Sequence, residues 1–193
     1  MSKIAVIGFG SLLWDLDDLA PKVSGEWKMY EGPVLPLEFS LVSRKRHFAL
    51  ALVIDYLDGA PCPTCVIDSV RSDISASVVD LAERERMAPS NIGFIDRDSG
   101  QSHSHRKETQ ETLWRWIKDT DYSGAVWTDG ERNFETLTGE HFSLKTAQDH
   151  LWSLKGVSLE EARRYIHEAP SQVQTPLRKA LEDSPWWHHE PKD

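Results

Sequence analysis

The chain has 193 residues, of which 39% are hydrophobic and 27% are charged, and its formal net charge is −9 at pH 7. This size and composition are ordinary for a globular protein with one core. We therefore predict a single domain over residues 1–185, followed by a C-terminal tail over residues 186–193. The negative charge argues against a general nucleic-acid binder and against attraction to an anionic membrane surface.

The longest apolar run, around Phe48 to Ile54, has the length of a strand and is far too short to span a membrane. Residues Met1–Lys3 lead directly into the first predicted strand, so we expect no signal peptide. Two cysteines cannot build a disulfide framework. A cytoplasmic location is therefore the expectation.

The first predicted strand, Lys3–Gly8, leads into a glycine-containing turn that we call the corner (Gly8–Leu12). Two glycines let the backbone turn sharply and leave amide N–H groups uncovered, so the corner can bind a carboxylate or phosphate. A dinucleotide-binding fingerprint would need a third glycine or an alanine in place of Leu13. The alternative is a tight strand-to-helix turn that binds no ligand.

Three more strands are predicted over Leu37–Ser43, His47–Ile54 and Cys65–Arg71. The second of these is almost wholly apolar, as expected of a strand that is covered on both faces. Cys62 and Cys65 have the two-residue spacing of redox and zinc sites, but the chain has no second pair and they precede a strand rather than a helix. We therefore favour a structural or incidental role for both cysteines over a functional one, and we predict no metal site.

A helix is predicted to begin near Ser77, because Asp80 three residues later resembles a capping box, and to end before Pro89. At about 100° per residue its apolar residues lie on one face. That face consists of Val78, Val79, Leu81 and Ala82.

Glu85, seven residues after Val78, returns to this apolar face, whereas Glu83 points toward solvent. An apolar setting disfavours the charged form of a carboxylate and raises its pKa, which makes it a usable general base and acid near neutral pH. The alternative is an ion pair between Glu85 and an arginine such as Arg84 or Arg86.

The remaining predicted strands are Ile92–Asp96 and Ala125–Thr128, and the remaining helices are 109–119, 143–154, 158–169 and 175–184. Strands gather early and helices late, which is typical of an α+β protein. The polar stretch Arg97–Arg106 and the residues after Trp187 are expected to be disordered. Trp186 and Trp187 are expected to pack over the body of the protein or, if exposed, to form an association surface.

Taken together, the corner and the downstream glutamate resemble the gamma-glutamylcyclotransferase superfamily, including its ChaC-type branch. In that family a Tyr-Gly-Ser-Leu segment at the end of the first strand grips the γ-glutamyl moiety, largely through backbone amides. The matching residues are Phe9, Gly10, Ser11 and Leu12, with Phe9 in place of the tyrosine. In ChaC-type members the acid/base glutamate lies downstream in an Arg-Glu pair, and the Arg84-Glu85 pair is the similar element here, with Glu85 as the matching glutamate. The resemblance extends to about residue 183 and implies a mixed barrel-like sheet with flanking helices.

The resemblance implies a cyclotransferase that releases 5-oxoproline from glutathione, a γ-glutamyl amino acid or a γ-glutamylamine. Glu85 would be the general base and acid. Gly10, Ser11 and Leu12 would hold a substrate carboxylate or carbonyl oxygen, and Phe9 would pack against the glutamyl methylenes. The substrate supplies its own nucleophile, so no metal, cofactor or covalent intermediate is required. The expected partner is this small molecule, with no nucleic acid and no membrane.

The alternative is a non-catalytic module that binds a γ-glutamyl or other carboxylate ligand at the same corner. A salt bridge to Glu85 would favour this alternative, because a paired carboxylate is a poor base. The sequence predicts neither the leaving amine nor the oligomeric state.

Overall fold

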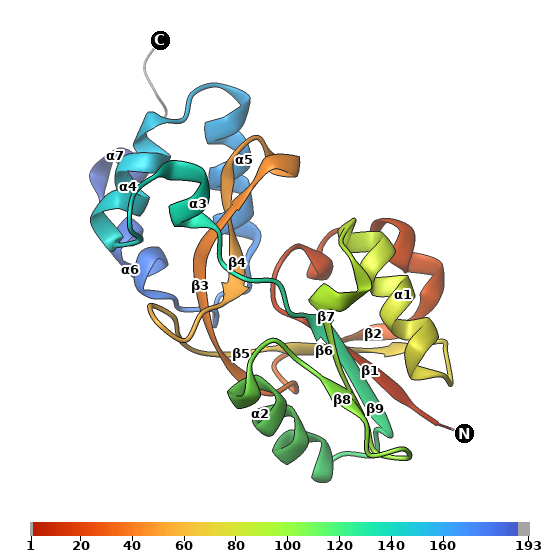
Figure 1. Cartoon of the computed structure of the whole chain (residues 1–193). Coiled ribbons are helices and arrows are strands. Elements are labelled where there is room, and N and C mark those ends of the chain that lie inside the picture. Colours follow the sequence, from red (N-terminus) through yellow and green to blue (C-terminus); the bar gives the residue numbers. More distant parts are fainter. Residues whose placement is uncertain (1, 189–193) are drawn as a thin grey trace. The chain divides into compact units, whose positions relative to one another are not determined.

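The computed structural model describes residues 2–188 and divides the chain into two compact units (Figure 1). Unit 1 comprises Met1–Leu35 and Pro63–Gly130, and unit 2 comprises Pro36–Cys62 and Glu131–Asp193. Both units contain a sheet and helices, which confirms the α+β class. That residues 1–185 fold as a single domain stays a prediction.

Unit 1 is built on a six-stranded sheet in the order β2-β6-β1-β9-β7-β8. Strand β1 runs antiparallel to β6 and parallel to β9, so the sheet is mixed. The strands are β1 (Ile4–Gly8), β2 (Val23–Lys28), β6 (Cys65–Ser69), β7 (Ile92–Asp96), β8 (Ser102–His103) and β9 (Gly124–Thr128).

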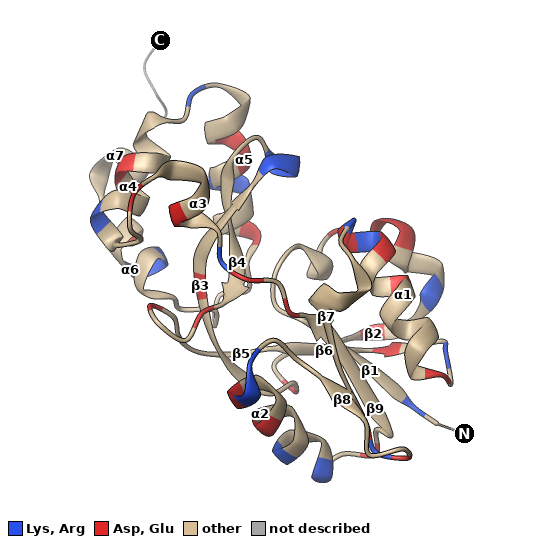
Figure 2. Cartoon of the chain, viewed as in Figure 1, with Lys and Arg blue, Asp and Glu red and all other residues tan. Residues whose placement is uncertain are grey.

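Two helices cover this sheet, α1 (Ile74–Glu85) and α2 (Lys107–Lys118), and they lie on opposite sides of it (Figure 1). Because both faces are covered, every residue of the central strand β1 is buried, as its apolar sequence requires. Figure 2 shows acidic and basic residues close together on α1. Three 3₁₀ helices complete the unit, Ser11–Leu13, Asp17–Lys22 and Pro89–Asn91.

One apolar cluster joins the sheet of unit 1, the corner and α1. Val6 of β1 lies opposite Ile67 of β6 and Val126 of β9, and all three side chains belong to the cluster. Leu12 of the corner and Leu81 of α1 are buried in the same cluster. Burial of these side chains away from water therefore brings the corner beside α1, although the two are far apart in sequence.

Gly93 of β7 is required by close packing within the sheet. It lies opposite Trp127 of β9, whose indole is fully buried, and a Cβ atom at this position would be 2.1 Å from Trp127 Cε2. We expect Gly93→Ala to lower the free energy of unfolding by about 2 kcal/mol, because the backbone or the indole must move. Denaturant unfolding measures the change.

The matched control is Gly130→Ala in the same unit, where an added Cβ atom meets no other atom within 4 Å. We expect this variant to change the free energy of unfolding by less than about 0.5 kcal/mol. Equal stabilities of the two variants would contradict the packing argument.

Unit 2 contains a three-stranded sheet in the order β4-β3-β5, in which β3 and β4 are antiparallel. Helix α5 packs against β4, and α4 contacts both α5 and α6. The elements are β3 (Val34–Ser43), β4 (Ala49–Ile54), β5 (Ala60–Pro63), α3 (Phe134–Thr138), α4 (Leu144–Ser153), α5 (Val157–Glu168), α6 (Pro176–Glu182) and α7 (Pro185–His188), with a 3₁₀ helix over Arg44–Arg46.

All six predicted strands and all five predicted helices are present, with shifted ends. Helix α1 starts earlier than predicted, because Asp73 caps it by accepting from the Ala76 amide, while Ser77 is buried. Strands β2, β5 and β8 were not predicted, and β8 lies within the stretch Arg97–Arg106 that we expected to be disordered. Among the described residues the strand pairings leave both sheets open, whereas the resemblance implies a barrel-like sheet.

The first residues of the predicted tail form α7. The Trp186 ring meets the rings of Trp152 and Trp187 edge-to-face, with centroids 5.0 and 5.5 Å apart. Trp186 and Trp187 are thereby half-buried, while residues 189–193 lie outside the described residues. None of the described helices is both long enough and apolar enough to cross a membrane.

Candidate functional site

Backbone hydrogen bonds hold the corner, and their donors are residues that follow Gly10, Ser11 and Leu12. The Leu13 amide donates to the Gly10 carbonyl oxygen at 3.1 Å, and the Asp15 amide donates to the Ser11 carbonyl oxygen at 2.9 Å. The amides of Gly10, Ser11 and Leu12 precede the first of these bonds. Such leading amides have no partner within their own turn, so they are the donors that a bound anion would use.

The apolar residues of the corner belong to the protein interior. Phe9 and Leu12 are only 5% and 4% exposed. A Cβ atom on Gly8 would lie 2.6 Å from Cη2 of the Trp27 indole. Gly8 is therefore explained by packing against Trp27, and the proposed contact of Phe9 with a ligand stays a prediction.

Glu85 is the last residue of α1. The helix ends there because Arg86 adopts a left-handed conformation, with a φ of 55°, and its amide bonds back to the carbonyl oxygens of Ala82 and Glu83. The Glu85 side chain is 19% exposed, whereas that of Glu83 is 59% exposed. The two glutamates therefore differ in burial in the direction that the helical wheel predicts.

Arg84, next to Glu85, connects the two halves of the candidate site. Its side chain is only 1% exposed, and its Nη1 donates to Glu85 Oε1 at 2.6 Å. Both Nη1 and Nη2 lie 3.4 Å from Ser11 Oγ, and Nη2 also donates to the Asp15 carbonyl oxygen. One buried guanidinium thus contacts the corner and the candidate catalytic carboxylate.

The sequence pointed to Arg84 as the neighbour of Glu85 in an Arg-Glu pair and as an alternative ion-pair partner, but not as a residue of the site, although a signal for its burial exists. Ser77, Leu81 and Arg84 are spaced as i, i+4 and i+7, and all three are buried. The buried stripe of α1 is therefore centred one residue earlier than the predicted face. Val79, which we predicted on that face, is 45% exposed.

The pairing of Glu85 matches the alternative considered from the sequence. Arg84 is its partner, while Arg86 approaches Asp17 Oδ2 at 4.0 Å. A guanidinium at this distance stabilises a negatively charged carboxylate. Glu85 Oε2 accepts no hydrogen bond from the residues that the structure describes. The carboxylate therefore has one oxygen held by Arg84 and one available to a ligand.

Amide donors at the corner and a carboxylate at the end of α1 have the charge preferences that suit the two charged groups of a zwitterion. An anionic group can accept from the amides of Gly10, Ser11 and Leu12, while an ammonium group can donate to Glu85 Oε2. The α-carboxylate and α-ammonium groups of a γ-glutamyl compound are such a pair.

The two cysteines lack the properties of reactive or metal-binding thiols. Cys62 and Cys65 are both free and buried, and burial raises the pKa of each thiol. Reactive and metal-binding thiols instead have a lowered pKa. Burial of both side chains therefore fits the structural role that we predict for them.

No match to the chain was found among protein-family models, among curated proteins or among solved structures.

Proposed function

We propose that the protein is a γ-glutamyl cyclotransferase of the gamma-glutamylcyclotransferase-like superfamily, acting in the cytoplasm on a small γ-glutamyl compound. The supporting observation is the contact of the Arg84 guanidinium with both Ser11 Oγ, at 3.4 Å, and Glu85 Oε1, at 2.6 Å. Ser11 and Arg84 are separated by 73 positions in the chain. The two sequence segments that carry the resemblance thus meet around one side chain.

In the proposed reaction the α-amine nitrogen of the substrate attacks its own side-chain amide carbon. A new C–N bond closes 5-oxoproline, and the C–N bond to the leaving amine breaks. The α-ammonium group must lose protons for this attack, and the leaving nitrogen must gain them. Glu85 transfers them through Oε2, as general base and then as general acid, so that protons balance. Ring closure is intramolecular and needs no added nucleophile.

The corner would bind the part of the substrate that carries negative charge. Amides of Gly10, Ser11 and Leu12 would hold the α-carboxylate or the oxyanion that forms as the carbonyl is attacked. Donors already in place stabilise developing charge without reorganisation, and one such donor contributes about 100-fold to kcat in other acyl-transfer sites. Phe9 would line the pocket beside the glutamyl methylenes. The proposal invokes no metal or cofactor and no nucleic-acid or membrane partner.

The second candidate is a non-catalytic module that binds a γ-glutamyl or other carboxylate ligand. The Arg84–Glu85 ion pair, at 2.6 Å, favours this candidate, because a carboxylate held by a guanidinium can serve as a fixed binding group.

One assay separates the two candidates. The protein is incubated with glutathione, γ-glutamyl amino acids and γ-glutamylamines, and 5-oxoproline is measured by mass spectrometry. Binding to the same compounds is measured by calorimetry. We expect 5-oxoproline from at least one class. Binding without product would instead establish the binding module, and the absence of both would contradict both candidates.

A further inference from the structure

We propose that Arg84 is the positioning residue of this site, which sets the place of the Glu85 carboxylate relative to the corner. The inference rests on the proposed cyclotransferase function and adds a residue to it. Arg84 itself contacts no reacting atom in this scheme. It acts through Glu85 and Ser11.

The guanidinium of Arg84 is anchored to the corner side of the site. Nη2 donates to the Asp15 carbonyl oxygen. Asp15 is itself held in place, because its backbone amide donates a hydrogen bond to the Ser11 carbonyl oxygen at 2.9 Å. Since the side chain is 1% exposed, the surrounding protein leaves it little freedom. The head group therefore has a defined place relative to the backbone of the corner.

The same head group holds the carboxylate. A guanidinium is a rigid planar fork, so two groups bonded to it are held at a defined separation. Ser11 Oγ lies 3.4 Å from both Nη atoms, and Glu85 Oε1 lies 2.6 Å from Nη1. The position of Oε1 relative to Ser11 is therefore set by one planar group.

The remaining donor of Arg84 supports a positioning role. Nε is buried, and it has no hydrogen-bond partner among the described residues. A buried donor without a partner costs about 1–3 kcal/mol. The guanidinium is thus oriented so that its Nη atoms contact Ser11, Asp15 and Glu85, while Nε is left without a hydrogen bond among the described residues. Within the described part of the chain, Glu85 is also the carboxylate that balances the positive charge of Arg84.

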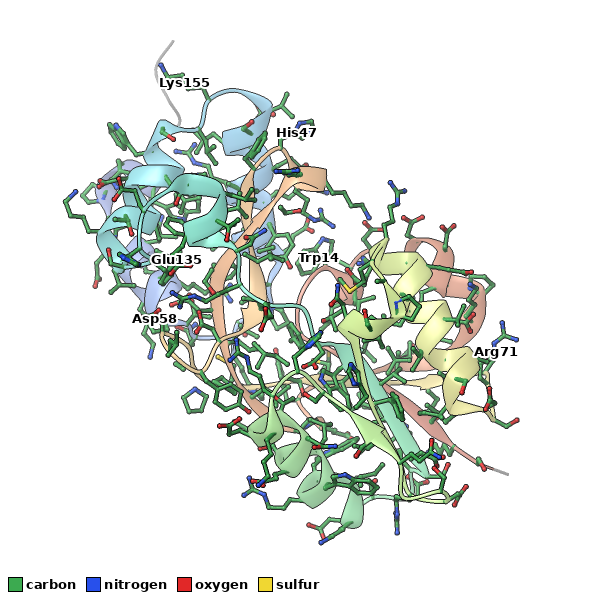
Figure 3. All side chains as sticks on the ribbon, in the orientation of Figure 1. Trp14, His47, Asp58, Arg71, Glu135 and Lys155 are labelled. Carbon is green, nitrogen blue, oxygen red and sulfur yellow. The ribbon has the colours of Figure 1, made fainter. Side chains whose placement is uncertain are left out.

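Arg71 offers a matched control near the other end of α1 (Figure 3). It binds Asp80 through two hydrogen bonds, from Nε at 2.7 Å and from Nη2 at 3.2 Å. Its side chain is 45% exposed and makes no hydrogen bond to the corner. The pair therefore has the same chemistry as Arg84–Glu85 without the link to the site.

The test compares Arg84→Lys with Arg71→Lys in the full-length protein. Lysine keeps the positive charge but cannot bridge the hydroxyl and the carboxylate with one planar group. We expect Arg84→Lys to lower kcat for 5-oxoproline formation at least about tenfold, with KM changed less than about threefold, because a misplaced catalytic group slows the chemical step. Arg71→Lys should change neither constant.

A second variant, Ser11→Ala, removes the hydroxyl that the guanidinium contacts and keeps the Arg84–Glu85 pair. We expect it to lower kcat as well. The fold-decrease in kcat of the double variant should be much smaller than the product of the two single fold-decreases, because both substitutions break the same link between Ser11 and Glu85. A structural effect on the fold would instead give losses that multiply.

Thermal unfolding establishes which variants are folded. A folded Arg84→Lys variant with kcat within about twofold of the parent value overturns the inference. An equal loss in Arg71→Lys, or fully multiplicative losses in the double variant, also overturns it. If Arg84→Lys does not fold, Ser11→Ala decides by the same criterion on kcat. A parent protein that makes no 5-oxoproline contradicts the proposed function, and the inference then fails with it.

Discussion

Replacement of Glu85 by glutamine is expected to abolish 5-oxoproline formation, with a fall in kcat of at least about 100-fold. Glutamine keeps the length of the side chain, and its amide oxygen can still accept from Arg84. It cannot take a proton from the substrate ammonium group. Mass-spectrometric detection of 5-oxoproline under steady-state conditions measures the loss.

The structure adds a cost in stability to this substitution. Glu85→Gln removes the negative charge that lies 2.6 Å from Nη1 of the buried Arg84 guanidinium. Leaving a buried charge without its partner is strongly destabilising, and because glutamine still accepts a hydrogen bond we expect a loss of about 2 kcal/mol in the free energy of unfolding. Activity must therefore be measured well below the unfolding transition of the variant.

Glu83→Gln is the matched control for this experiment. Glu83 lies on the same helix, is 59% exposed and pairs with Lys22 at 2.6 Å. A surface ion pair contributes at most about 1 kcal/mol, so we expect nearly unchanged stability and full activity. Full activity of Glu85→Gln would contradict its proposed role, whereas equal losses in both variants would attribute the effect to α1 as a whole.

Unit 2 is expected to lose stability as the pH rises toward neutrality, because it buries the carboxyl group of Glu38 completely. Oε1 accepts from the Phe39 amide at 2.7 Å, and Oε2 accepts from the Leu177 amide of α6 at 3.0 Å. Burial raises the pKa of Glu38 from 4.5 to about 7, against the opposing effect of these amides and the Thr175 hydroxyl. The negative charge of Asp55 adds to the increase.

The sign of the effect follows from proton binding. With a pKa of about 7 in the folded protein and 4.5 as its ordinary value, Glu38 binds a proton more tightly when unit 2 is folded. Its contribution to stability is therefore fully present below pH 4.5 and is lost as the pH rises through about 7. The difference corresponds to about 3 kcal/mol in the free energy of unfolding.

Comparison with Glu38→Gln isolates this contribution. Glutamine does not titrate, so the stability of the variant should lack the decline between pH 4.5 and about 7. Burial acts to raise the pKa of Asp55, but hydrogen bonds from Ser40 and the backbone and the charge of Arg132 lower it overall. The contribution of Asp55 to stability therefore has the opposite pH dependence. The pKa of Asp55 lies below its ordinary value of 3.8, so Asp55 titrates outside the pH range in which the two proteins are compared. Parallel pH profiles of unfolding for the two proteins would contradict the prediction.

Local sequence rules predicted several parts of the fold well. Ser143 and Thr175 cap α4 and α6 as their sequences indicate, because an N-cap depends on residues within one turn. The predicted strand Ile92–Asp96 has the same ends as β7. In each case the decisive interactions are local or depend on a simple apolar pattern.

The missed strands lack such a local signal. Strand β2 has exposed and half-buried positions without alternation and contains Gly25 at a φ of 79°. Strand β8 has two residues and exists through its pairing with β7. Edge strands of this kind are defined by their partners, so their own composition predicts a loop.

The candidate site likewise has features that local sequence predicts and features that depend on distant residues. By itself the sequence determined that Glu85 turns further inward than Glu83, because this follows from the geometry of one helix. That the amides of the corner are free to bind an anion stays a prediction. Only the tertiary structure decided that Arg84 is buried and that it joins Ser11 to Glu85. A charged side chain enters the interior only where partners compensate it. Glu85 balances the charge of Arg84, and its other partners, Ser11 and Asp15, come from a distant segment that meets α1 where Leu12 and Leu81 share one core.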